Sequence, residues 1–464
     1  MPDNDPLFWP IARLTDAYAA GDLSPVEVAR DAFDRIEAFD PLLHSYLSLS
    51  PTLAMEQAQH AERRYRETDT PQAPLLGVPL SIKDLFDVRG ETTTLGSRAY
   101  GQDAAETDST PVRLLRDAGS VFLGKSNTAE FGQSATTGNL LGPDCGNPWD
   151  PSRTSGGSSG GAAASVGAGL ATAALGSDGG GSIRIPAALC GLFGIKPTFT
   201  GTPEHDSFHA MTRFVCTGPL TRSVDDARTV LGVLLERSFP RGPQRKMRIG
   251  WCASPLDRPV DPGVREVTAA AVALLPGLGH EVDEISLPIE GWADAFGPLV
   301  LADEWTYRRH LLEEARDQLT TYVRKGIEAG ASVTEADVAR ALEIKQDVTR
   351  RVQSLFDTYD LVITPTTACV AFPIDERPTL IDGKKVDPLW GPFPFTAPFN
   401  VSGSPGASLP VGLVDGIPVG LQVVGGHDRE DVILDLCEQL EAAVGFPGQQ
   451  MVDRWSLPAH EGVH

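Results

Sequence analysis

The fold of this chain depends on a run of small residues that begins with Gly156-Gly157-Ser158-Ser159-Gly160-Gly161 and ends with Asp178-Gly179-Gly180-Gly181-Ser182-Ile183-Arg184. No charged residue lies between Arg153 and Asp178, and Gly, Ala, Ser and Thr make up most of this part of the chain. Small side chains let backbone segments approach closely and leave main-chain N–H groups uncovered. We therefore expect a closely packed site here, with a serine at each end of the run.

The composition is that of an ordinary globular protein. The chain has 464 residues, of which 41% are hydrophobic and 22% are charged, and the net charge is −23. An acidic surface repels phosphate backbones, so we expect no nucleic-acid partner. The uncharged run is too rich in Gly and Ser for a membrane helix, and the acidic start Met1–Asp5 lacks the apolar segment of a signal peptide. These features predict a cytoplasmic protein with no membrane association.

The cysteines give no sign of a metal centre or of a disulfide framework. The chain has six cysteines, and none of them forms a C-x-x-C pair or a Cys/His cluster with metal-ligand spacing. We expect six reduced thiols, no metal and no cofactor.

Helix and strand patterns alternate along most of the chain. The segment Ser24-Pro25-Val26-Glu27 is a capping box with Pro at the first helical position, and it predicts a helix to about Ala38. Further helices are expected at 52–66, 111–117, 264–275 and 429–443, and strands at 80–83, 121–123, 247–253, 280–286, 361–364, 408–411 and 419–424. This alternation indicates an α/β protein. We expect a single large α/β/α domain over residues 1–464, with a mixed central sheet covered by helices.

One part of this domain departs from the alternating pattern. Residues 289–357 have a mostly helical pattern, and the capping box Ser332-Val333-Thr334-Glu335 predicts a long helix towards Phe356. Residues 367–406 are rich in Pro, Gly and aromatic residues, which is typical of an irregular surface segment. We expect a helical excursion followed by a long loop.

Two familiar motifs match the sequence in letters but not in context. Residues 119–126 fit the phosphate-loop pattern G-x-x-x-x-G-K-S, yet the Val-Phe-Leu inside it predicts a strand and not a loop. Gly156-x-Ser158-x-Gly160 fits the nucleophile elbow of α/β-hydrolases, but turn-forming residues stand where the preceding strand should be. The elbow also requires a later histidine, and His427 lies in an expected loop. Nucleotide binding is rejected, and the elbow remains a weak alternative.

The segment Asp178–Ser182 offers a different acyl-transfer chemistry. Three glycines before Ser182 expose consecutive N–H groups beside a hydroxyl, as a nucleophile with an oxyanion hole requires. Lys83, at the end of an apolar strand, could serve as the base if burial keeps it neutral. A plain glycine turn and an ion-paired lysine are the structural alternatives, and neither spacing nor composition excludes them.

At this point the residues resemble a known family, the amidase signature family. Ser158 follows Lys83 by 75 residues and Ser182 follows Ser158 by 24 (182 − 158), which agrees with the family's spacing. The two segments quoted first carry the resemblance, with Ile185-Pro186-Ala187 after them. Five further segments fit the family: Gly77-Val78-Pro79-Leu80-Ser81-Ile82-Lys83-Asp84, Gly124-Lys125-Ser126-Asn127-Thr128-Ala129-Glu130-Phe131, Gly194-Ile195-Lys196-Pro197-Thr198, Gly218-Pro219-Leu220-Thr221-Arg222 and Gly416-Ile417-Pro418-Val419-Gly420-Leu421-Gln422. The resemblance runs from about residue 9 to 443 and implies the amidase signature fold.

The resemblance also implies a Ser–Ser–Lys triad. Ser182 would be the nucleophile, Ser158 would bridge it to Lys83 through a cis Gly157–Ser158 peptide, and Lys83 would be the base. The N–H groups of Gly179, Gly180 and Gly181, together with that of Ser182, would hold the oxyanion. Asp178 and Arg184 are expected to brace the loop.

The substrate is less well defined by the sequence. The resemblance implies a hydrolase of small amides, with carbamates (urethanes) and esters as further candidates. The alternative is the glutaminase (A-type) subunit of a tRNA-dependent amidotransferase, which typically has Gln where this chain has Ile185 and differs in the segment 199–213. A non-catalytic binding protein is the weaker alternative, and the resemblance allows a monomer or a homodimer. Four aromatic residues are expected either to pack a loop or to line an apolar pocket: Trp390, Phe393, Phe395 and Phe399.

Overall fold

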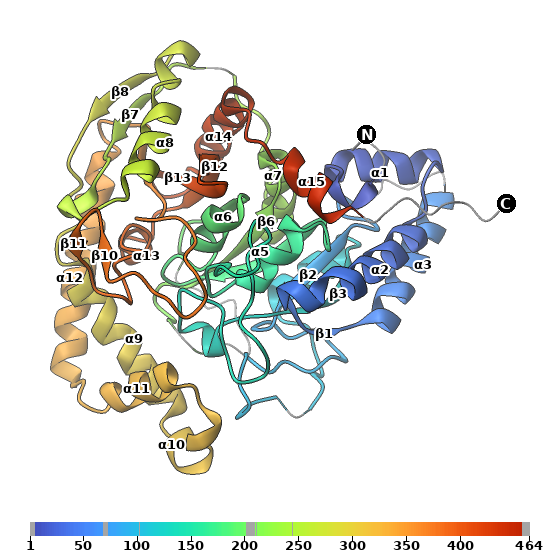
Figure 1. Cartoon of the computed structure of the whole chain (residues 1–464), viewed down its shortest axis with the longest axis horizontal. Coiled ribbons are helices and arrows are strands. Elements are labelled where there is room, and N and C mark those ends of the chain that lie inside the picture. The colour runs from blue at the N-terminus through green and yellow to red at the C-terminus, as the bar shows by residue number, and fades with distance from the viewer. Residues whose placement is uncertain are drawn as a thin grey trace.

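A computed structural model describes residues 5–67, 73–101, 103–200, 209, 211–243 and 245–456. Its strands form an 11-stranded mixed sheet in the order β1-β3-β2-β4-β6-β5-β12-β13-β9-β7-β8, with a separate two-stranded ribbon β10-β11 (Figure 1). The bounds of the strands are β1 Tyr46–Leu49, β2 Pro79–Lys83, β3 Val121–Ser126, β4 Ala173–Asp178, β5 Phe193–Lys196, β6 Cys216–Thr221, β7 Arg248–Trp251, β8 Glu281–Glu284, β9 Leu361–Pro365, β10 Leu380–Ile381, β11 Lys384–Lys385, β12 Gly406–Val414 and β13 Ile417–Gly425.

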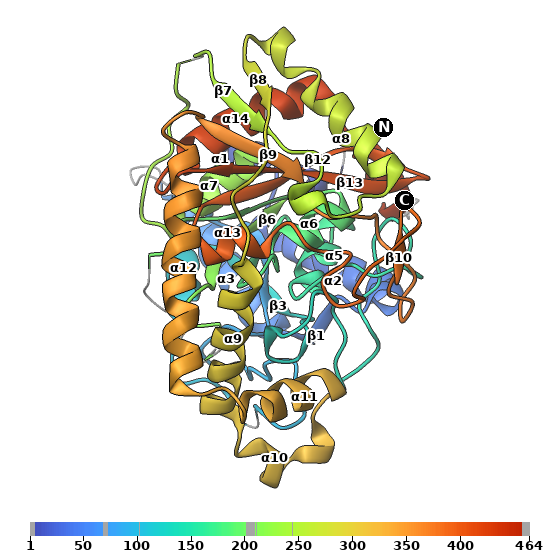
Figure 2. The ribbon, with the colours of Figure 1, turned by 90° about the vertical axis from the view of Figure 1, so that its left-hand side faces the viewer.

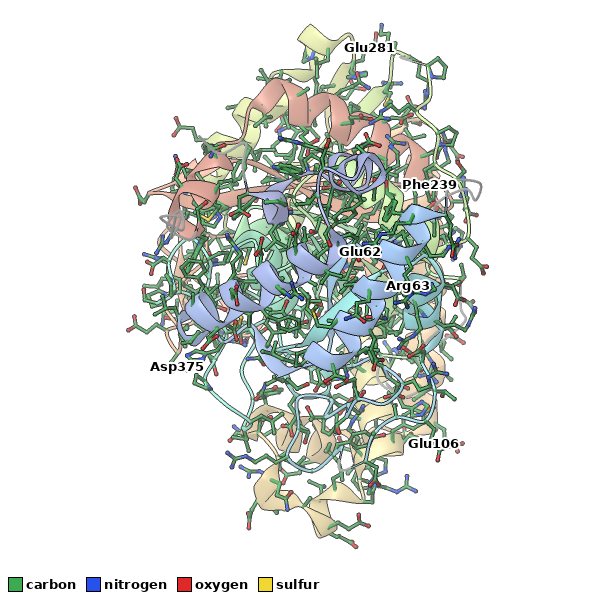
Figure 3. All side chains as sticks on the ribbon, turned by 90° about the vertical axis from the view of Figure 1, so that its right-hand side faces the viewer. Glu62, Arg63, Glu106, Phe239, Glu281 and Asp375 are labelled. Carbon is green, nitrogen blue, oxygen red and sulfur yellow. The ribbon has the colours of Figure 1, made fainter. Side chains whose placement is uncertain are left out.

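Helices cover both faces of the sheet, so the predicted α/β/α class is confirmed. In Figure 2 the strands β9, β12 and β13 form a band, with α8 and α14 on one side and α6 and α13 on the other. Figure 3 looks onto helices α2 and α3 and labels Glu62 and Arg63 on α3. The bounds of the helices are α1 Ile11–Ala20, α2 Pro25–Leu43, α3 Pro51–Arg66, α4 Thr110–Asp117, α5 Gly160–Gly167, α6 Arg184–Cys190, α7 Val224–Leu234, α8 Pro262–Val272, α9 Trp292–Arg308, α10 Leu311–Glu314, α11 Thr321–Gly330, α12 Glu335–Leu355, α13 Ala397–Val401, α14 Glu430–Val444 and α15 Gln449–Trp455.

The order of strands β3, β2 and β4 places Lys83 next to the start of the glycine-rich turn at Asp178. β2 lies between β3 and β4 and pairs in parallel with both, with Leu80 opposite Ala173 and Ile82 opposite Leu175. The carboxyl ends of parallel strands meet at one edge of a sheet. Lys83 ends β2 and Asp178 ends β4. The strand pairing therefore brings the lysine to the start of the glycine-rich turn.

The run of small residues becomes the buried helix α5, which packs against β2, β4 and β6. Every residue from Gly160 to Gly167 in this helix is buried. A Cβ atom on Gly161 would lie 2.5 Å from the Ser45 carbonyl oxygen, so only glycine fits at this approach. The small residues thus allow a helix to lie directly against the strands that hold Lys83 and Asp178.

The segment predicted as a helical excursion contains α9, α10, α11 and α12, which lie together at one end of the molecule in Figure 1. The second capping box differs from the prediction by two residues. The N-cap is Thr334, whose hydroxyl accepts from the Asp337 N–H while Asp337 bonds back to Thr334. Asp can complete the box as Glu does, because either carboxylate reaches the N-cap N–H.

The loop expected at 367–406 is shorter than predicted, since it contains the β10-β11 ribbon and the short helix α13. The helix predicted after Ser24 is α2, and it is longer than expected because it continues to Leu43, with Pro41 near its end. Ser24 is its N-cap, but the predicted box with Glu27 is not formed, since the Ser24 hydroxyl accepts from the Val26 N–H and donates to Glu62. The phosphate-loop match at 119–126 contains strand β3, as predicted, and Lys125 pairs with the Asp84 carboxylate at 2.8 Å. The single-domain assignment stays a prediction.

Candidate active site

Lys83 is fully buried at the end of β2, and its amine is surrounded by serine hydroxyls. Its Nζ lies 2.8 Å from Ser158 Oγ, 2.7 Å from Ser159 Oγ and 3.0 Å from Ser177 Oγ. Within the described part of the chain these are its hydrogen-bond partners, and none is a carboxylate. The alternative in which Lys83 is held by an ion pair with a carboxylate is therefore not observed among the described residues.

Burial lowers the pKa of Lys83 well below its usual value, and the Asp178 carboxylate opposes part of this shift. Desolvation disfavours a charged amine when no counter-ion compensates for it. A neutral amine has two N–H donors and one lone pair, which matches three hydroxyl neighbours. The surroundings of Lys83 thus suit an amine that accepts and returns a proton.

Ser159 fixes the direction of one of these hydrogen bonds. Its hydroxyl donates to the Ser177 carbonyl oxygen at 3.2 Å, so toward Lys83 it acts as an acceptor. One N–H of Lys83 is thereby committed to Ser159. The other N–H and the lone pair remain for Ser158 and Ser177.

Ser158 precedes α5, and the Gly157–Ser158 peptide bond is cis, as the resemblance implied. The backbone here is tightly packed, since a Cβ atom on Gly157 would lie 2.6 Å from the Thr136 carbonyl carbon. The Ser158 hydroxyl is buried with Lys83 as its hydrogen-bond partner.

Ser182, the expected nucleophile, lines a cavity. Its side chain is 8% exposed, and its carbonyl oxygen accepts from the Ser159 N–H at 3.2 Å. Among the described residues its hydroxyl makes no hydrogen bond, so the Ser158–Ser182 hydroxyl contact expected from the resemblance is not formed in the free protein. Catalytic hydrogen bonds often tighten only when substrate is bound.

Asp178 and Arg184 brace the glycine turn, as expected. Both side chains are fully buried and they form a bidentate ion pair, with Arg184 Nη2 2.9 Å from Asp178 Oδ1 and Nε 2.9 Å from Oδ2. Burial by itself would raise the pKa of Asp178, but the Arg184 guanidinium reverses this shift and holds the pKa well below its usual value. The carboxylate also accepts from Asn400 Nδ2 at 2.8 Å.

The expected oxyanion donors are at the turn that follows. The Gly181 N–H donates to Asp178 Oδ1 at 2.7 Å, so an oxyanion would have to share this donor with the carboxylate. The Gly180 carbonyl oxygen of the same peptide accepts from Thr396 Oγ1 at 2.7 Å, which helps to fix the orientation of the Gly180–Gly181 peptide. The assignment of Gly179, Gly180 and Gly181 to an oxyanion hole stays a prediction.

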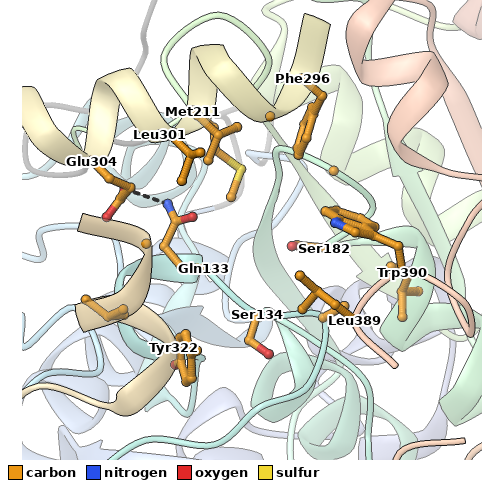
Figure 4. Close-up of a pocket in the computed structure, with 18 residues that line it drawn as sticks. Gln133, Ser134, Ser182, Met211, Phe296, Leu301, Glu304, Tyr322, Leu389 and Trp390 are labelled. Atoms are coloured by element: carbon orange, nitrogen blue, oxygen red, sulfur yellow. Dashed lines mark hydrogen bonds between the residues drawn. The ribbon is translucent and has the colours of Figure 1, made fainter. Parts of the chain in front are cut away.

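The cavity beside Ser182 has a volume of about 310 Å³ (Figure 4). It lies between the glycine turn, α9, α11 and the segment around Trp390. Most of its side chains are apolar, and a buried carboxyl lies at one side: Ile185, Met211, Phe296, Val300, Leu301, Val323, Leu389, Trp390 and Glu304. The site can thus hold an apolar group next to the Ser182 hydroxyl.

The four aromatic residues predicted at 390–399 have two different roles. Trp390 lines the cavity and lies edge-on to Phe296, with ring centroids 5.5 Å apart. The three phenylalanines are buried in hydrophobic clusters, so the packing interpretation holds for them: Phe393, Phe395 and Phe399. A proline-rich composition could not separate the two roles.

Sequence reasoning missed several residues of the site. Ser159 and Ser177 contact Lys83, and Phe296 and Glu304 line the cavity from α9. The four-residue spacing of Phe296, Val300 and Glu304 puts a carboxyl on an apolar helix face, and this pattern was a readable signal. No sequence pattern of this kind pointed to Thr396, whose hydroxyl donates to the Gly180 carbonyl oxygen.

Other candidate sites find no support in the described residues. Within them, no group of His, Cys, Asp and Glu side chains is arranged for a metal ion. His427, the histidine weighed for a nucleophile elbow, contacts the Ser402 carbonyl oxygen at 2.9 Å. No helix of the described ranges combines the length and the apolar character that a membrane span requires. The predicted departure at 199–213 falls mostly on 201–208 and 210, which lie outside the described residues.

Comparisons with known proteins agree with this architecture. The family model described as Amidase matches residues 27–434. The A subunit of the glutamyl-tRNA(Gln) amidotransferase of Carboxydothermus hydrogenoformans is 31% identical over 474 residues, covering 93% of this chain and 96% of its own length. The corresponding protein of a Geobacter species is 33% identical and covers the same shares of the two chains.

Solved structures of two amide-cleaving enzymes share the fold. The crystal structure of an amidase superposes with a TM-score of 0.88 at 30% identity, covering 94% of this chain and 100% of that chain. A bacterial aryl acylamidase of the amidase signature enzymes superposes with a TM-score of 0.86 at 29% identity, covering 97% and 99%. The fold and the matched residues define an enzyme of a group that contains both amidases and amidotransferase subunits. The chain belongs to the amidase signature family.

Proposed function

We propose that this protein hydrolyses amide C–N bonds, with Ser182 as the nucleophile, Ser158 as the proton bridge and Lys83 as the base. The observation that supports this proposal most is the environment of Lys83, a fully buried amine whose partners in the described chain are three serine hydroxyls. Two other lysines of the described chain are buried as deeply, and neither has three hydroxyl partners: Lys125 pairs with the Asp84 carboxylate, and Lys196 donates to the Pro197 carbonyl oxygen at 2.7 Å.

The proposed reaction has two halves. Ser182 Oγ attacks the amide carbon while its proton passes to Ser158 and the proton of Ser158 passes to neutral Lys83. The C–N bond then breaks as Lys83 returns a proton through Ser158 to the leaving nitrogen, which an amine needs because it leaves poorly unprotonated. Water takes the place of the amine and hydrolyses the acyl-enzyme by the reverse relay. This route requires the Ser182 hydroxyl to reach Ser158 when substrate is bound.

The cavity favours substrates with an apolar group. Ile185 lines it where the glutaminase subunit typically has Gln, and Phe296 and Trp390 stand beside the turn. Among the described residues that line it, none carries a positive charge that could hold the α-carboxylate of glutamine. We therefore propose aryl or alkyl amides as the substrate class, with carbamates and esters as chemically accessible side substrates.

The second candidate is the glutaminase subunit of a tRNA-dependent amidotransferase. The curated relatives favour it over a free-standing amidase, since such A-type subunits cover almost the whole chain at about one-third identity. In that case the chain would work with partner subunits and release ammonia from glutamine. The cytoplasmic location and the absence of a cofactor are part of both proposals, and a monomer or homodimer is part of the first.

One substrate panel separates these candidates. The purified chain is assayed alone with anilides, aliphatic amides, carbamates and glutamine, with product release as the readout. Robust anilide hydrolysis and weak glutaminase activity would support the hydrolase. Glutamine hydrolysis that depends on added partner subunits, without anilide turnover, would support the alternative. A chain that cleaves no compound and resists labelling by a fluorophosphonate would be a binding protein.

A further inference from the structure

Glu304 is a buried carboxyl in the cavity that the proposed reaction does not use. It lies on α9 and is 2% exposed. Figure 4 shows Glu304 with Gln133 on one side of the cavity and Ser182 with Trp390 on the other. Any substrate that fills the cavity from Ser182 therefore approaches this carboxyl.

The two oxygens of Glu304 are in different situations. Oε1 accepts from Gln133 Nε2 at 2.8 Å and from Arg308 Nη1 at 2.7 Å. Oε2 is buried and has no hydrogen-bond partner among the residues that the structure describes. An acceptor buried without a donor is costly, and natural proteins rarely leave one unless a ligand or a water supplies it.

The neighbouring carboxylates differ from Glu304 in this respect. Asp303 bonds Arg213 through Oδ1 and Thr212 through Oδ2. Glu130 bonds Ser97 through Oε1 and Thr320 through Oε2. Each of these neighbours uses both oxygens within the protein, whereas Glu304 uses one.

The charges around Glu304 disfavour a ligand anion, and above pH 7, where the carboxyl is mostly ionised, its free oxygen can only accept a hydrogen bond. Burial raises the pKa of Glu304 to about 7, Arg308 opposes this shift, and Asp303 and Glu130 add to it. Three carboxyls thus stand near the cavity end, and the guanidiniums that face them, from Arg308 and Arg213, already bond Glu304 and Asp303. A ligand N–H or O–H would relieve the unpaired oxygen, while a ligand anion would meet like charge.

The length of α9 sets the reach that such a ligand needs. Phe296, whose ring faces Gly180, and Glu304 are eight residues apart on this helix. At 1.5 Å per residue their Cα atoms are about 12 Å apart. A substrate that contacts both ends is longer than a simple acetamide or glutamine side chain.

We propose that Glu304 selects substrates by accepting a hydrogen bond from an N–H or O–H group at the end of the substrate far from the scissile carbonyl. The preferred substrate is then an elongated amide with an apolar body between the scissile carbonyl and a terminal donor. This inference rests on the proposed amide hydrolysis at Ser182, and it adds a specificity residue to that site.

The test compares matched substrate pairs that differ only in the terminal donor. On the acyl side, p-nitroanilides of straight-chain acids of graded length are compared with those of the corresponding ω-hydroxy acids. On the amine side, acetanilide is compared with 4-hydroxyacetanilide. Wild-type protein should prefer the donor-bearing member of at least one pair by about tenfold or more in kcat/KM, mainly through KM.

The variant Glu304→Gln should lose this preference, because its amide oxygen would still accept from Gln133 and Arg308 while an NH2 group, which cannot accept, takes the place of the free oxygen. Asp303→Asn is the matched control, because this neighbouring carboxylate has both oxygens bonded within the protein, and it should leave the preference unchanged. Glu304→Asp provides a second variant, in which the preference should move to a longer ω-hydroxy acid. Thermal unfolding checks that each variant is folded.

Binding measurements keep this test separate from the test of catalysis. Calorimetry with Ser182→Ala and Ser182→Ala/Glu304→Gln compares the same pairs without turnover. Equal affinity and equal kcat/KM for both members of every pair in the wild-type site would overturn the role of Glu304, even if amides are cleaved. A donor preference in binding that Glu304→Gln abolishes would support it, even if no amide is cleaved and the proposed reaction fails.

Discussion

The Nζ of Lys83 lies 2.8 Å from Ser158 Oγ in a position where neither side chain reaches solvent. The hydroxyl of Ser159, 2.7 Å away on the same amine, points its own proton at the Ser177 carbonyl oxygen. This direction forces Lys83 to donate to Ser159. The lone pair of a neutral Lys83 is then free to face the hydroxyl of Ser158, which is the first step of the proposed relay.

Ser159 is therefore expected to be a positioning residue. Ser159→Ala should lower kcat for amides by roughly tenfold, as expected for the loss of one hydrogen bond, with little change in KM. A hydroxyl acceptor favours the charged form of an amine, so its removal should lower the pKa of Lys83 further. The acid limb of the pH–rate profile should then move to lower pH.

The control for this experiment is Ser165→Ala. Ser165 is also buried, but its hydroxyl contacts Ser81 and the Ala162 carbonyl oxygen instead of Lys83. This variant should leave the acid limb in place. A rate loss in Ser159→Ala without any shift of the limb would indicate a purely structural role for Ser159.

Ser182 is expected to carry the acyl group. Ser182→Ala should reduce amide hydrolysis by at least about 10³-fold and abolish labelling by a fluorophosphonate, because no other hydroxyl replaces the nucleophile. Mass spectrometry of the labelled wild-type protein should find the modification on Ser182. Ser134 lines the same cavity, and Ser134→Ala should still be labelled. Full labelling of Ser182→Ala would assign the nucleophile to another residue.

The ion pair under the glycine turn is expected to be needed for folding. Arg184→Met should lower the free energy of unfolding by about 3–5 kcal/mol, because it leaves the buried Asp178 carboxylate without its cation. Denaturant titration measures this change. Arg350→Met is the control, since Arg350 is 75% exposed in its pair with Asp347 and should change stability by less than about 0.5 kcal/mol. Similar losses in both variants would contradict a special role for the buried pair.

The raised pKa of Glu304 predicts a pH-dependent stability difference. Burial lifts this pKa from about 4.3 in the unfolded chain to about 7 in the folded protein. Over that window the folded state holds more protons, so the contribution of Glu304 to stability falls as pH rises and is most unfavourable above pH 7. The full change is on the order of 4 kcal/mol.

Glu304→Gln cannot titrate and should not show this loss. The melting temperature of the variant minus that of wild-type protein should therefore rise between about pH 5 and about pH 8, while other groups titrate alike in both proteins. A difference that stays constant over this range would mean that the carboxyl does not change protonation there.

Much of the fold could be predicted because its signals are local. The capping residue Ser24 precedes α2, and the segment predicted as a strand at 80–83 lies in β2, Pro79–Lys83, whose five residues are all buried. Lys83 and the run of small residues could be combined only through the family resemblance. Neither spacing nor composition shows that strand β4 lies beside β2, and this pairing is what brings Ser177 to Lys83.

The residues that line the cavity were also hard to predict, because the sequence does not show which distant segments become neighbours. Its wall comes from α9 and α11, more than 100 residues after Ser182 in the chain, and a helix pattern does not reveal which surface it faces. Trp390 and Phe393 have similar sequence surroundings, yet the first lines the cavity and the second is buried in the core. Such differences depend on tertiary packing and not on local pattern.

The most direct measurement of the central claim compares Lys83→Met with wild-type protein on an anilide and on the activated ester with the same acyl group. Methionine fills most of the space of the lysine but can neither accept nor return a proton. If Lys83 protonates the leaving amine through Ser158, kcat/KM should fall at least about 100-fold more for the anilide than for the ester, whose leaving group departs without a proton. Equal losses for both substrates in a folded variant would contradict the proposed relay.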